Sequence, residues 1–496
     1  MALRLALRAP RSRLYNCLSI TTRRVFSTSK QSDYFTVELS PKIKVSSVTR
    51  SIVDFADPPK DPSRLLQTVR SQINITNPSR HDAAVILATP QYAQWLGKKE
   101  FMSEFVDMLS GSDGTGEFHT LAAVVDHIAP PVPSNKPIQG ISILRGNLDG
   151  ILPGLWTEAP PKEWSDGGKV SALTMDLGSP HITIPLTNTT FQNHRTSTLI
   201  ISRYDLSAGS PKLIEQTDKK HLQRVTIPVQ KRLSSINDLG IWAPLVPLTQ
   251  PRVVTESFGN IVRRVDIEDE SVPASTELEP AVDELHASKS DLVQSPMGIW
   301  AMITPPTFVQ SGGSSPYVNP DPEATFTDGQ SITELTAVTS DQLGILYRQG
   351  GRLYQVLSGG GGWGAKKGLL SLDPEQTHFV VSEEEEMQRF IQAMEGGNFV
   401  PVSSKIQFFA STDASASELV GNKQTETGVV FGTASKVEVE TDMSPSQPEA
   451  LLLENHFGAL SNVGIFVTSS DASMFSKPGL NNDWKLNVPN SRIYVI

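Results

Sequence analysis

The hydrophobic residues of the first half of the chain are grouped in short runs that predict strands, with helical spacing between them. An apolar run at 83–88 ends at Thr89-Pro90, as is typical of a buried strand. The stripe that follows predicts a helix ending at Gly111. Further buried strands are expected at 121–125 and 141–144. The helical stripe consists of Phe101, Phe105, Met108 and Leu109.

Later in the chain, short runs rich in β-branched residues predict further strands. Ser382 and Glu385 form a capping box, which predicts a helix that ends at Gly396. A shorter helix is expected from Asp341 to Gln349. The predicted strands cover 182–186, 198–202, 225–227, 406–410, 429–431, 464–468 and 493–496.

The order of strand, helix and strand indicates an α/β or α+β fold, with helices packed on β-sheets. Acidic residues and prolines interrupt this pattern at 263–295, which predicts an acidic linker. The chain would then contain two mixed α/β portions, an N-terminal domain at 36–262 and a C-terminal domain at 296–496. Each portion is long enough to bury a core of its own.

The N-terminal segment differs in composition from the rest of the chain. Its first 26 residues contain six arginines and no acidic residue. This Arg-rich and hydroxyl-rich pattern predicts a mitochondrial transit peptide, which we assign to residues 1–35 with cleavage near Phe26 or Ser27. The expected location is the mitochondrial matrix. The alternative is a disordered basic tail.

Charge and cysteine content exclude several classes of function. The chain has 43 basic and 53 acidic residues, a net charge of −10, and removing the six arginines leaves 37 against 53, or −16. Direct binding to nucleic acid is therefore not expected. The single cysteine, Cys17, lies in the predicted presequence, so disulfides, cysteine-based metal sites and a cysteine nucleophile are not expected after cleavage. No apolar run approaches the ~20 residues of a membrane span.

A glycine-rich tract is the candidate ligand site. Gly359, Gly361 and Gly364 have G-x-G-x-x-G spacing, but no helix or acidic partner clearly follows them. The P-loop pattern fails because Ala365 occupies the lysine position. The tract is either a flexible hairpin loop or a site where backbone N–H groups and lysines bind an anion. The candidate residues are Gly359, Gly360, Gly361, Gly362, Gly364, Lys366 and Lys367.

Two other segments carry polar groups beside predicted strands. His119 and His127 flank an apolar strand, with Asp126 next to His127. These residues either act in acid–base chemistry or are simply polar residues at the ends of a strand. Residues 186–193 are rich in Asn and Thr and either line a pocket or form a turn. No catalytic residue, metal site or cofactor is assigned, because no complete motif is present.

The pattern of residues 83–89, the helix around 101–109 and the strands at 121–125 and 140–144 resembles the start of a FIST domain. The resemblance implies a ligand-sensing or signalling module of mixed α/β architecture. It covers less than a third of the chain, and the N-terminus also resembles those of fungal mitochondrial precursors. Asp126-His127 departs from the Gly-Cys-type turn of that family.

These observations favour a mitochondrial matrix module for ligand sensing or protein interaction, without catalysis. Its expected partner is a small anionic ligand or a mitochondrial protein. The first alternative is an enzyme that binds a phosphorylated or acyl substrate at the glycine-rich tract. The second is an accessory factor for mitochondrial gene expression or complex assembly.

Overall fold

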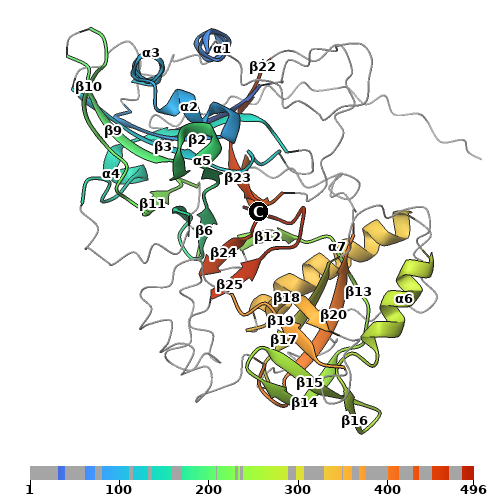
Figure 1. Cartoon of the computed structure of the whole chain (residues 1–496). Coiled ribbons are helices and arrows are strands. Elements are labelled where there is room, and N and C mark those ends of the chain that lie inside the picture. The colour runs from blue at the N-terminus through green and yellow to red at the C-terminus, as the bar shows by residue number, and fades with distance from the viewer. Residues whose placement is uncertain are drawn as a thin grey trace, which may run out of the picture. The chain divides into compact units, whose positions relative to one another are not determined.

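The computed structural model describes 26 strands and seven α-helices (Figure 1). The described residues are 32–39, 62–72, 81–110, 116–131, 137–157, 170–207, 209–229, 233–234, 238–288, 298–306, 329–348, 350–359, 368–375, 400–412, 428–434, 450–468 and 483–495.

The largest open sheet has seven strands and contains residues from both ends of the described chain. β2 and β3 are parallel, whereas all other neighbours in the sheet are antiparallel. In spatial order the strands are β10 (Lys212–Thr217), β9 (Leu199–Asp205), β3 (Glu117–Val124), β2 (Ala83–Ala88), β4 (Gly140–Gly146), β1 (Ser32–Leu39) and β22 (Ala450–Glu454).

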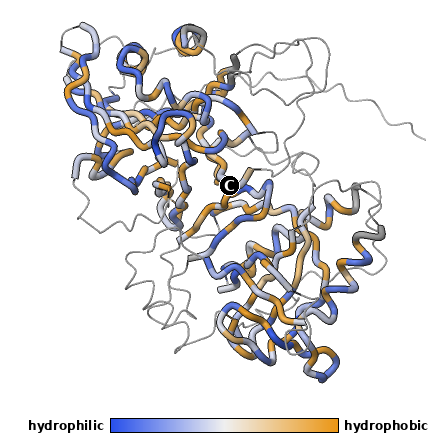
Figure 2. Tube along the Cα trace, viewed as in Figure 1, coloured by the Kyte–Doolittle hydropathy of each residue, from blue (hydrophilic) through white to orange (hydrophobic). Residues whose placement is uncertain are grey.

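Helices cover one face of this sheet, and their apolar residues share a core with alternate residues of the strands. Phe105 of α3, Ile86 of β2 and Val37 of β1 are all fully buried there. Figure 2 shows α1 and α3 with both apolar and polar residues along their traces, as expected of surface helices. The strand expected at 83–88 and the helix expected before Gly111 are confirmed. The covering elements are α1 (Ser63–Gln72), the 3₁₀ turn η1 (Pro90–Tyr92), α2 (Ala93–Leu96) and α3 (Lys99–Ser110).

Two smaller sheets contribute apolar residues to the core on the other face of the seven-stranded sheet. Leu121 of β3, Met175 of β5 and Phe431 of β21 belong to this one core. The five-stranded sheet consists of β11 (Leu222–Thr226), β5 (Ala172–Asp176), β6 (His181–Pro185), β24 (Ile465–Thr468) and β25 (Asp483–Leu486). The four-stranded sheet consists of β12 (Leu239–Trp242), β26 (Arg492–Val495), β21 (Gly428–Thr433) and β23 (His456–Ser461).

Six further strands form a closed barrel, because β17 pairs with both β18 and β20. Alternate residues of β17 enter different cores: Ala301 and Ile303 pack with residues of the barrel, whereas Trp300 and Met302 join the core of the open sheets. The barrel strands are β20 (Lys405–Ser411), β14 (Arg252–Phe258), β15 (Ile261–Ile267), β19 (Leu370–Leu372), β18 (Arg352–Gly359) and β17 (Ile299–Thr304), with β13 (Leu245–Pro247) and β16 (Glu270–Pro273) paired beside them.

The remaining elements are a small hairpin and four helices. β7 and β8 pair only with each other within the described chain. Their bounds are β7 (Asn188–Thr189), β8 (Arg195–Ser197), α4 (Leu148–Ile151), α5 (Thr190–Asn193), α6 (Leu278–Ser288) and α7 (Gly329–Arg348).

The expected α/β or α+β fold, with two portions of helices packed on sheets, is wrong. The described chain is rich in strands and contains a closed six-stranded barrel. The hydrophobic runs located individual strands correctly, but they carry no information about which strands pair. The pairing that closes the barrel joins residues 299–304 to residues 405–411, about a hundred positions apart along the chain.

The segment at 263–295, expected as an acidic linker, contains most of β15, all of β16 and α6. Sheets also combine residues from both sides of it, since β12 pairs with β26 and β1 with β22. The helix expected at 341–349 is real but starts at Gly329. The predicted helix at 382–396 lies outside the described residues, and β1 begins at Ser32, within the 1–35 assigned to the transit peptide.

Candidate functional site

The glycine-rich tract connects two antiparallel strands of the barrel. Gly359 is the last residue of β18 and pairs with Leu370 of β19. A Cβ atom at Gly359 would lie 2.2 Å from Cδ2 of Leu370 and 3.0 Å from the backbone oxygen of Leu369, so close packing against β19 favours glycine here. The anion site stays a prediction, because its other candidate residues lie outside the described chain. The candidate residues outside the described chain are Gly360, Gly361, Gly362, Gly364, Lys366 and Lys367.

The two histidines considered for acid–base chemistry lie at opposite ends of β3. Eight residues of extended chain span about 26 Å, so the two imidazoles belong to different sites. His119 accepts a hydrogen bond from Trp156 Nε1 at its Nδ1 atom, at 3.0 Å. The guanidinium of Arg203 lies 5.5 Å from the centroid of the Trp156 ring. Burial lowers the pKa of His119. These contacts explain His119 as a polar residue at the end of a strand.

His127 lies where the two parallel strands end. Because β2 and β3 run in the same direction, Thr89 and Asp126 emerge at one edge of the seven-stranded sheet. Val125 N donates to Ala88 O at 3.0 Å and holds the two strand ends together. In open sheets, ligands bind beside the carboxyl ends of parallel strands. We define the β2–β3 edge as Thr89, Gln91, Asp126, His127 and Gln139.

Thr89 attaches the start of β4 to this edge. Its backbone N–H donates to Gly140 O at 3.1 Å, and its side-chain oxygen accepts from Gly140 N, also at 3.1 Å. The Thr89 side chain is fully buried. Gln139 directly precedes Gly140, so these bonds bring the amide of Gln139 to the ends of β2 and β3.

Three side chains of the β2–β3 edge form a directed chain of hydrogen bonds. Gln91 Nε2 donates to Gln139 Oε1 at 2.6 Å, and Gln139 Nε2 lies 3.1 Å from His127 Nδ1. An amide nitrogen only donates, so Nδ1 is the acceptor and the proton of the neutral imidazole is on Nε2. Burial lowers the pKa of His127, and the positive charge of Arg492 lowers it further. His127 is therefore a neutral side chain with a donor at Nε2.

Asp126 connects this edge to the turn between β23 and β24. Its Oδ2 atom accepts a hydrogen bond from Asn462 N at 2.7 Å. The backbone of His127 also pairs with that of Leu460, with Leu460 N donating to His127 O at 2.9 Å. Burial raises the pKa of Asp126 to about 6, even though Asn462 stabilises the charged form. A carboxyl group that titrates near neutral pH is characteristic of functional sites, although structural networks also produce one.

Arg492, in β26, supplies positive charge to the same region. Its side chain is buried and donates to the carbonyl oxygens of Ser491, at 2.8 Å, and Thr433. Burial lowers the pKa of Arg492 to about 9, so the guanidinium is still charged at neutral pH. A buried cation beside a neutral imidazole creates a positive potential that attracts anions.

The Asn- and Thr-rich segment at 186–193 borders the end of β3. Thr187 N donates to Val124 O, and Val124 N donates to Thr198 O, both at 3.1 Å. The segment forms β7 and the single helical turn α5, where Phe191 is 95% exposed. The polar residues at 126–127 and the segment at 186–193 therefore meet at one end of the sheet.

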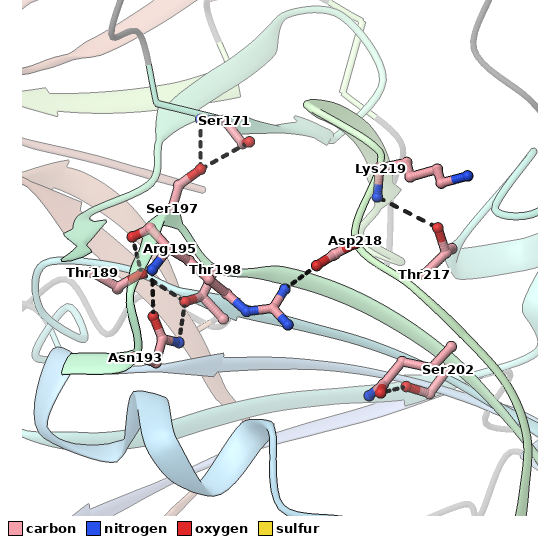
Figure 3. Close-up of polar contacts among 11 residues, drawn as sticks. Ser171, Thr189, Asn193, Arg195, Ser197, Thr198, Ser202, Thr217, Asp218 and Lys219 are labelled. Atoms are coloured by element: carbon pink, nitrogen blue, oxygen red, sulfur yellow. Dashed lines mark hydrogen bonds and ion pairs between the residues drawn. The ribbon is translucent and has the colours of Figure 1, made fainter. Parts of the chain in front are cut away.

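Figure 3 shows that polar side chains of this segment bond to Arg195 and Thr198, which follow it along the chain. Thr189 and Thr198 are fully buried, and their side-chain oxygens are 2.7 Å apart. Asn193 Nδ2 donates to Thr198 Oγ1 at 2.7 Å, and Arg195 forms an ion pair with Asp218. Because these groups satisfy one another, the network serves to fix the loop against β3.

Sequence reasoning singled out Asp126 and His127 but missed their partners. Gln91 and Gln139 carry a weak signal, since each lies near a predicted strand end. Arg492 carries none, because it is far from the other residues along the chain. Only the pairing of β26 with β21 and of β21 with β23 brings it near His127.

The β2–β3 edge can donate hydrogen bonds, attract negative charge and exchange a proton at Asp126. Within the described ranges, no three His, Cys, Asp or Glu side chains are grouped so that they could hold a metal ion. None of the helices in the described part of the chain combines the length and the hydropathy needed to cross a membrane.

No protein-family model, no curated protein and no solved structure matches this chain.

Proposed function

We propose that this chain is a mitochondrial matrix module that senses a small anionic ligand at the β2–β3 edge and passes on the signal by protein interaction, without catalysis. One observation supports the proposal above all: His127 accepts a hydrogen bond from the Gln139 amide, keeps its donor at Nε2, and experiences the positive charge of the buried Arg492. The N-terminal composition supports the location, and the resemblance to the FIST family supports a sensing role.

The direction of the hydrogen bonds favours an acceptor as the ligand. Gln91 donates to Gln139, and Gln139 donates to His127, so the chain of bonds ends in the N–H at Nε2 of the imidazole. A carboxylate or phosphate oxygen accepts from such a donor, and the charge of Arg492 strengthens that interaction where water is excluded. The anion would bind without displacing an existing partner of Gln91 or Gln139.

Asp126 couples ligand binding to the turn between β23 and β24. Its carboxylate accepts from Asn462 N in the turn between β23 and β24, so a change in its charge alters that turn. An anion bound beside His127 disfavours the charged form of Asp126. Ligand binding would thereby be coupled to a segment whose neighbouring strands belong to two smaller sheets.

Native mass spectrometry tests the proposal on protein purified from mitochondria of cells that produce the full chain. We expect a bound small molecule that is lost in His127→Ala and retained in His194→Asn, a control at an exposed histidine with positive φ, a conformation that asparagine tolerates. Partner capture from the same mitochondria tests the interaction role. The absence of ligand and partner, together with turnover of a phosphorylated or acyl substrate, would contradict the proposal and favour an enzyme.

A further inference from the structure

Five polar side chains are grouped on one face of the five-stranded sheet. In the strand register, Asp176 is opposite His181, and Thr174 is opposite both Thr183 and Arg224. Directly opposed residues of neighbouring strands place their side chains on the same face. The alternate residues of β5, among them Met175, are buried on the other face. The five polar residues therefore form a continuous patch, which we call the β5–β6–β11 patch.

A buried carboxylate organises this patch. Asp176 is only 4% exposed, and its Oδ1 atom accepts from Gly178 N at 2.8 Å and lies 3.4 Å from His181 Nδ1. Its Oδ2 atom is 3.2 Å from Arg224 Nε. The NH2 group of Arg224 in turn lies 2.8 Å from His181 Nε2. Asp176 thus fixes the orientation of both the imidazole and the guanidinium.

The contact between Arg224 and His181 defines the protonation of the imidazole. A guanidinium has no acceptor, so Arg224 donates and His181 Nε2 accepts. The imidazole is therefore neutral, and its proton is on Nδ1, facing Asp176. Protonation of Nε2 would remove the acceptor and break the contact with Arg224.

Arg224 keeps donors for a ligand. Its contacts with Asp176 and His181 use Nε and one NH2 hydrogen, while the NH1 group makes no hydrogen bond or ion pair within the described residues, and the side chain is 49% exposed. Thr174 and Thr183 form one hydrogen bond with each other, at 3.1 Å. That bond uses one of two hydroxyl hydrogens and leaves the other available.

We propose that the β5–β6–β11 patch binds a phosphate group, and that His181 takes up one proton from solvent as the phosphate binds. The phosphate oxygens accept hydrogen bonds from Arg224 and from a threonine hydroxyl. One oxygen takes the place of Arg224 at His181 Nε2, where the added proton makes the imidazole a donor. Asp176 continues to face Nδ1–H and stabilises the imidazolium. No covalent bond is made or broken.

The charges on the neighbouring strands permit this change. On β24, the residues opposite His181 and Thr183 are Thr468 and Phe466, both uncharged. Beyond them, Lys485 of β25 forms ion pairs with Asp373 and Glu375, at 2.9 and 3.1 Å. Asp176 and Arg224 both contact His181, and the positive charges of Arg224 and of the imidazolium favour a phosphate dianion there.

Isothermal titration calorimetry with inorganic phosphate tests the proposal on the full chain. We expect binding whose heat differs between two buffers of different ionisation enthalpy, which shows proton uptake. Arg224→Gln should weaken binding at least about tenfold, since a charge-assisted bidentate contact is lost. His181→Gln keeps a polar group near the Nε2 position and should bind more weakly, with equal heats in both buffers. Arg263→Gln, which removes an Arg–Glu pair in the barrel, should bind like the unmodified chain.

Two results would overturn the proposal. The first is no binding of phosphate, or equal binding by the Arg224→Gln variant and the unmodified chain, with circular dichroism showing both folded. The second is binding with identical heats in the two buffers, which would exclude proton uptake at His181. Phosphate bound at the β2–β3 edge would be lost in His127→Ala and kept in Arg224→Gln, so the failure of one proposal is distinguishable from the failure of the other.

Discussion

Gln139 donates a hydrogen bond from Nε2 to Nδ1 of His127, at 3.1 Å, and this contact determines which nitrogen of the imidazole carries the proton. The donor is itself oriented by Gln91, which occupies its amide oxygen at 2.6 Å. The Nε2–H group on which the proposed ligand site depends is therefore set by the hydrogen bond that Gln139 makes at the other nitrogen of the ring.

Gln139→Glu should favour the protonated form of His127. A carboxylate beside Nδ1 favours the imidazolium, so we expect the pKa of His127 to rise by about one unit or more. Nitrogen-15 chemical shifts of the imidazole in NMR spectra report this directly. Gln139→Leu serves as the control, since it removes the contact without adding charge. An unchanged pKa in Gln139→Glu would show that the contact does not hold in solution.

Asp126→Asn should remove a dependence of stability on pH. The folded-state pKa of Asp126 is about 6, above its ordinary 3.8, so its contribution is fully present below 3.8 and is lost as the pH rises through 6. Two pKa units correspond to about 3 kcal/mol. Between acid and neutral pH, the unmodified chain should therefore lose about 3 kcal/mol in free energy of unfolding that Asp126→Asn does not lose. Urea unfolding at several pH values measures this, with exposed Asp107→Asn as control; parallel curves would contradict it.

His456→Asn should make the chain more resistant to acid. Burial lowers the pKa of His456 to about 4 from its ordinary 6.5, so the stability it provides is present above 6.5 and is lost as the pH falls through 4. Its Nδ1 atom lies 2.9 Å from Thr36 Oγ1, a contact that the asparagine amide can replace. We expect the variant to lose about 3 kcal/mol less than the unmodified chain over this range.

Acid titration followed by tryptophan fluorescence compares His456→Asn with the unmodified chain. The exposed substitution His194→Asn is the matched control and should leave the acid midpoint unchanged. An equal midpoint for His456→Asn would mean that His456 does not titrate with unfolding.

Asp33→Ala should destabilise the seven-stranded sheet. Arg145 is 5% exposed and donates to Asp33 Oδ1 from Nε, at 2.8 Å, to Asp33 Oδ2, and to Leu109 O at 3.0 Å. Removing the carboxylate leaves a buried charge, which we expect to cost about 2–3 kcal/mol because Asp33 is partly exposed. Thermal unfolding measures the loss. In the exposed Arg195–Asp218 pair, Asp218→Ala should cost less than about 1 kcal/mol, and an equal loss in the two variants would contradict the role of Asp33.

Local patterns located elements well where apolar residues face one core. The run at 83–88 and the stripe before Gly111 correspond closely to β2 and α3. The start of α7 was missed because its most buried residues there are hydroxylic, and only Ile332 and Leu335 pack apolar side chains on the barrel core. The acidic residues of β15 and β16 likewise led to the prediction of a linker where these two strands lie. The buried hydroxylic residues of α7 are Thr333, Thr336, Thr339 and Ser340.

Long-range pairing accounts for what sequence patterns could not predict. Neither the closure of the barrel by β17 and β20 nor the addition of β22 to β1 leaves a local signal. The same limit applies to the β2–β3 edge. Asp126-His127 was noticed because both are polar residues at a strand end, whereas Arg492 reaches them only through the pairing of three strands.

A thermal stability scan tests the central proposal most directly. The protein beginning near Ser27 would be scanned against nucleotides, acyl-CoA species, amino acids and organic acids. A ligand at about 100 times its dissociation constant adds about 2.7 kcal/mol, which raises the melting temperature by a few degrees. We predict such a rise for at least one anion, its loss in His127→Ala and its retention in His194→Asn. No rise with any anion, or a rise that persists in His127→Ala, would contradict a ligand site at the β2–β3 edge.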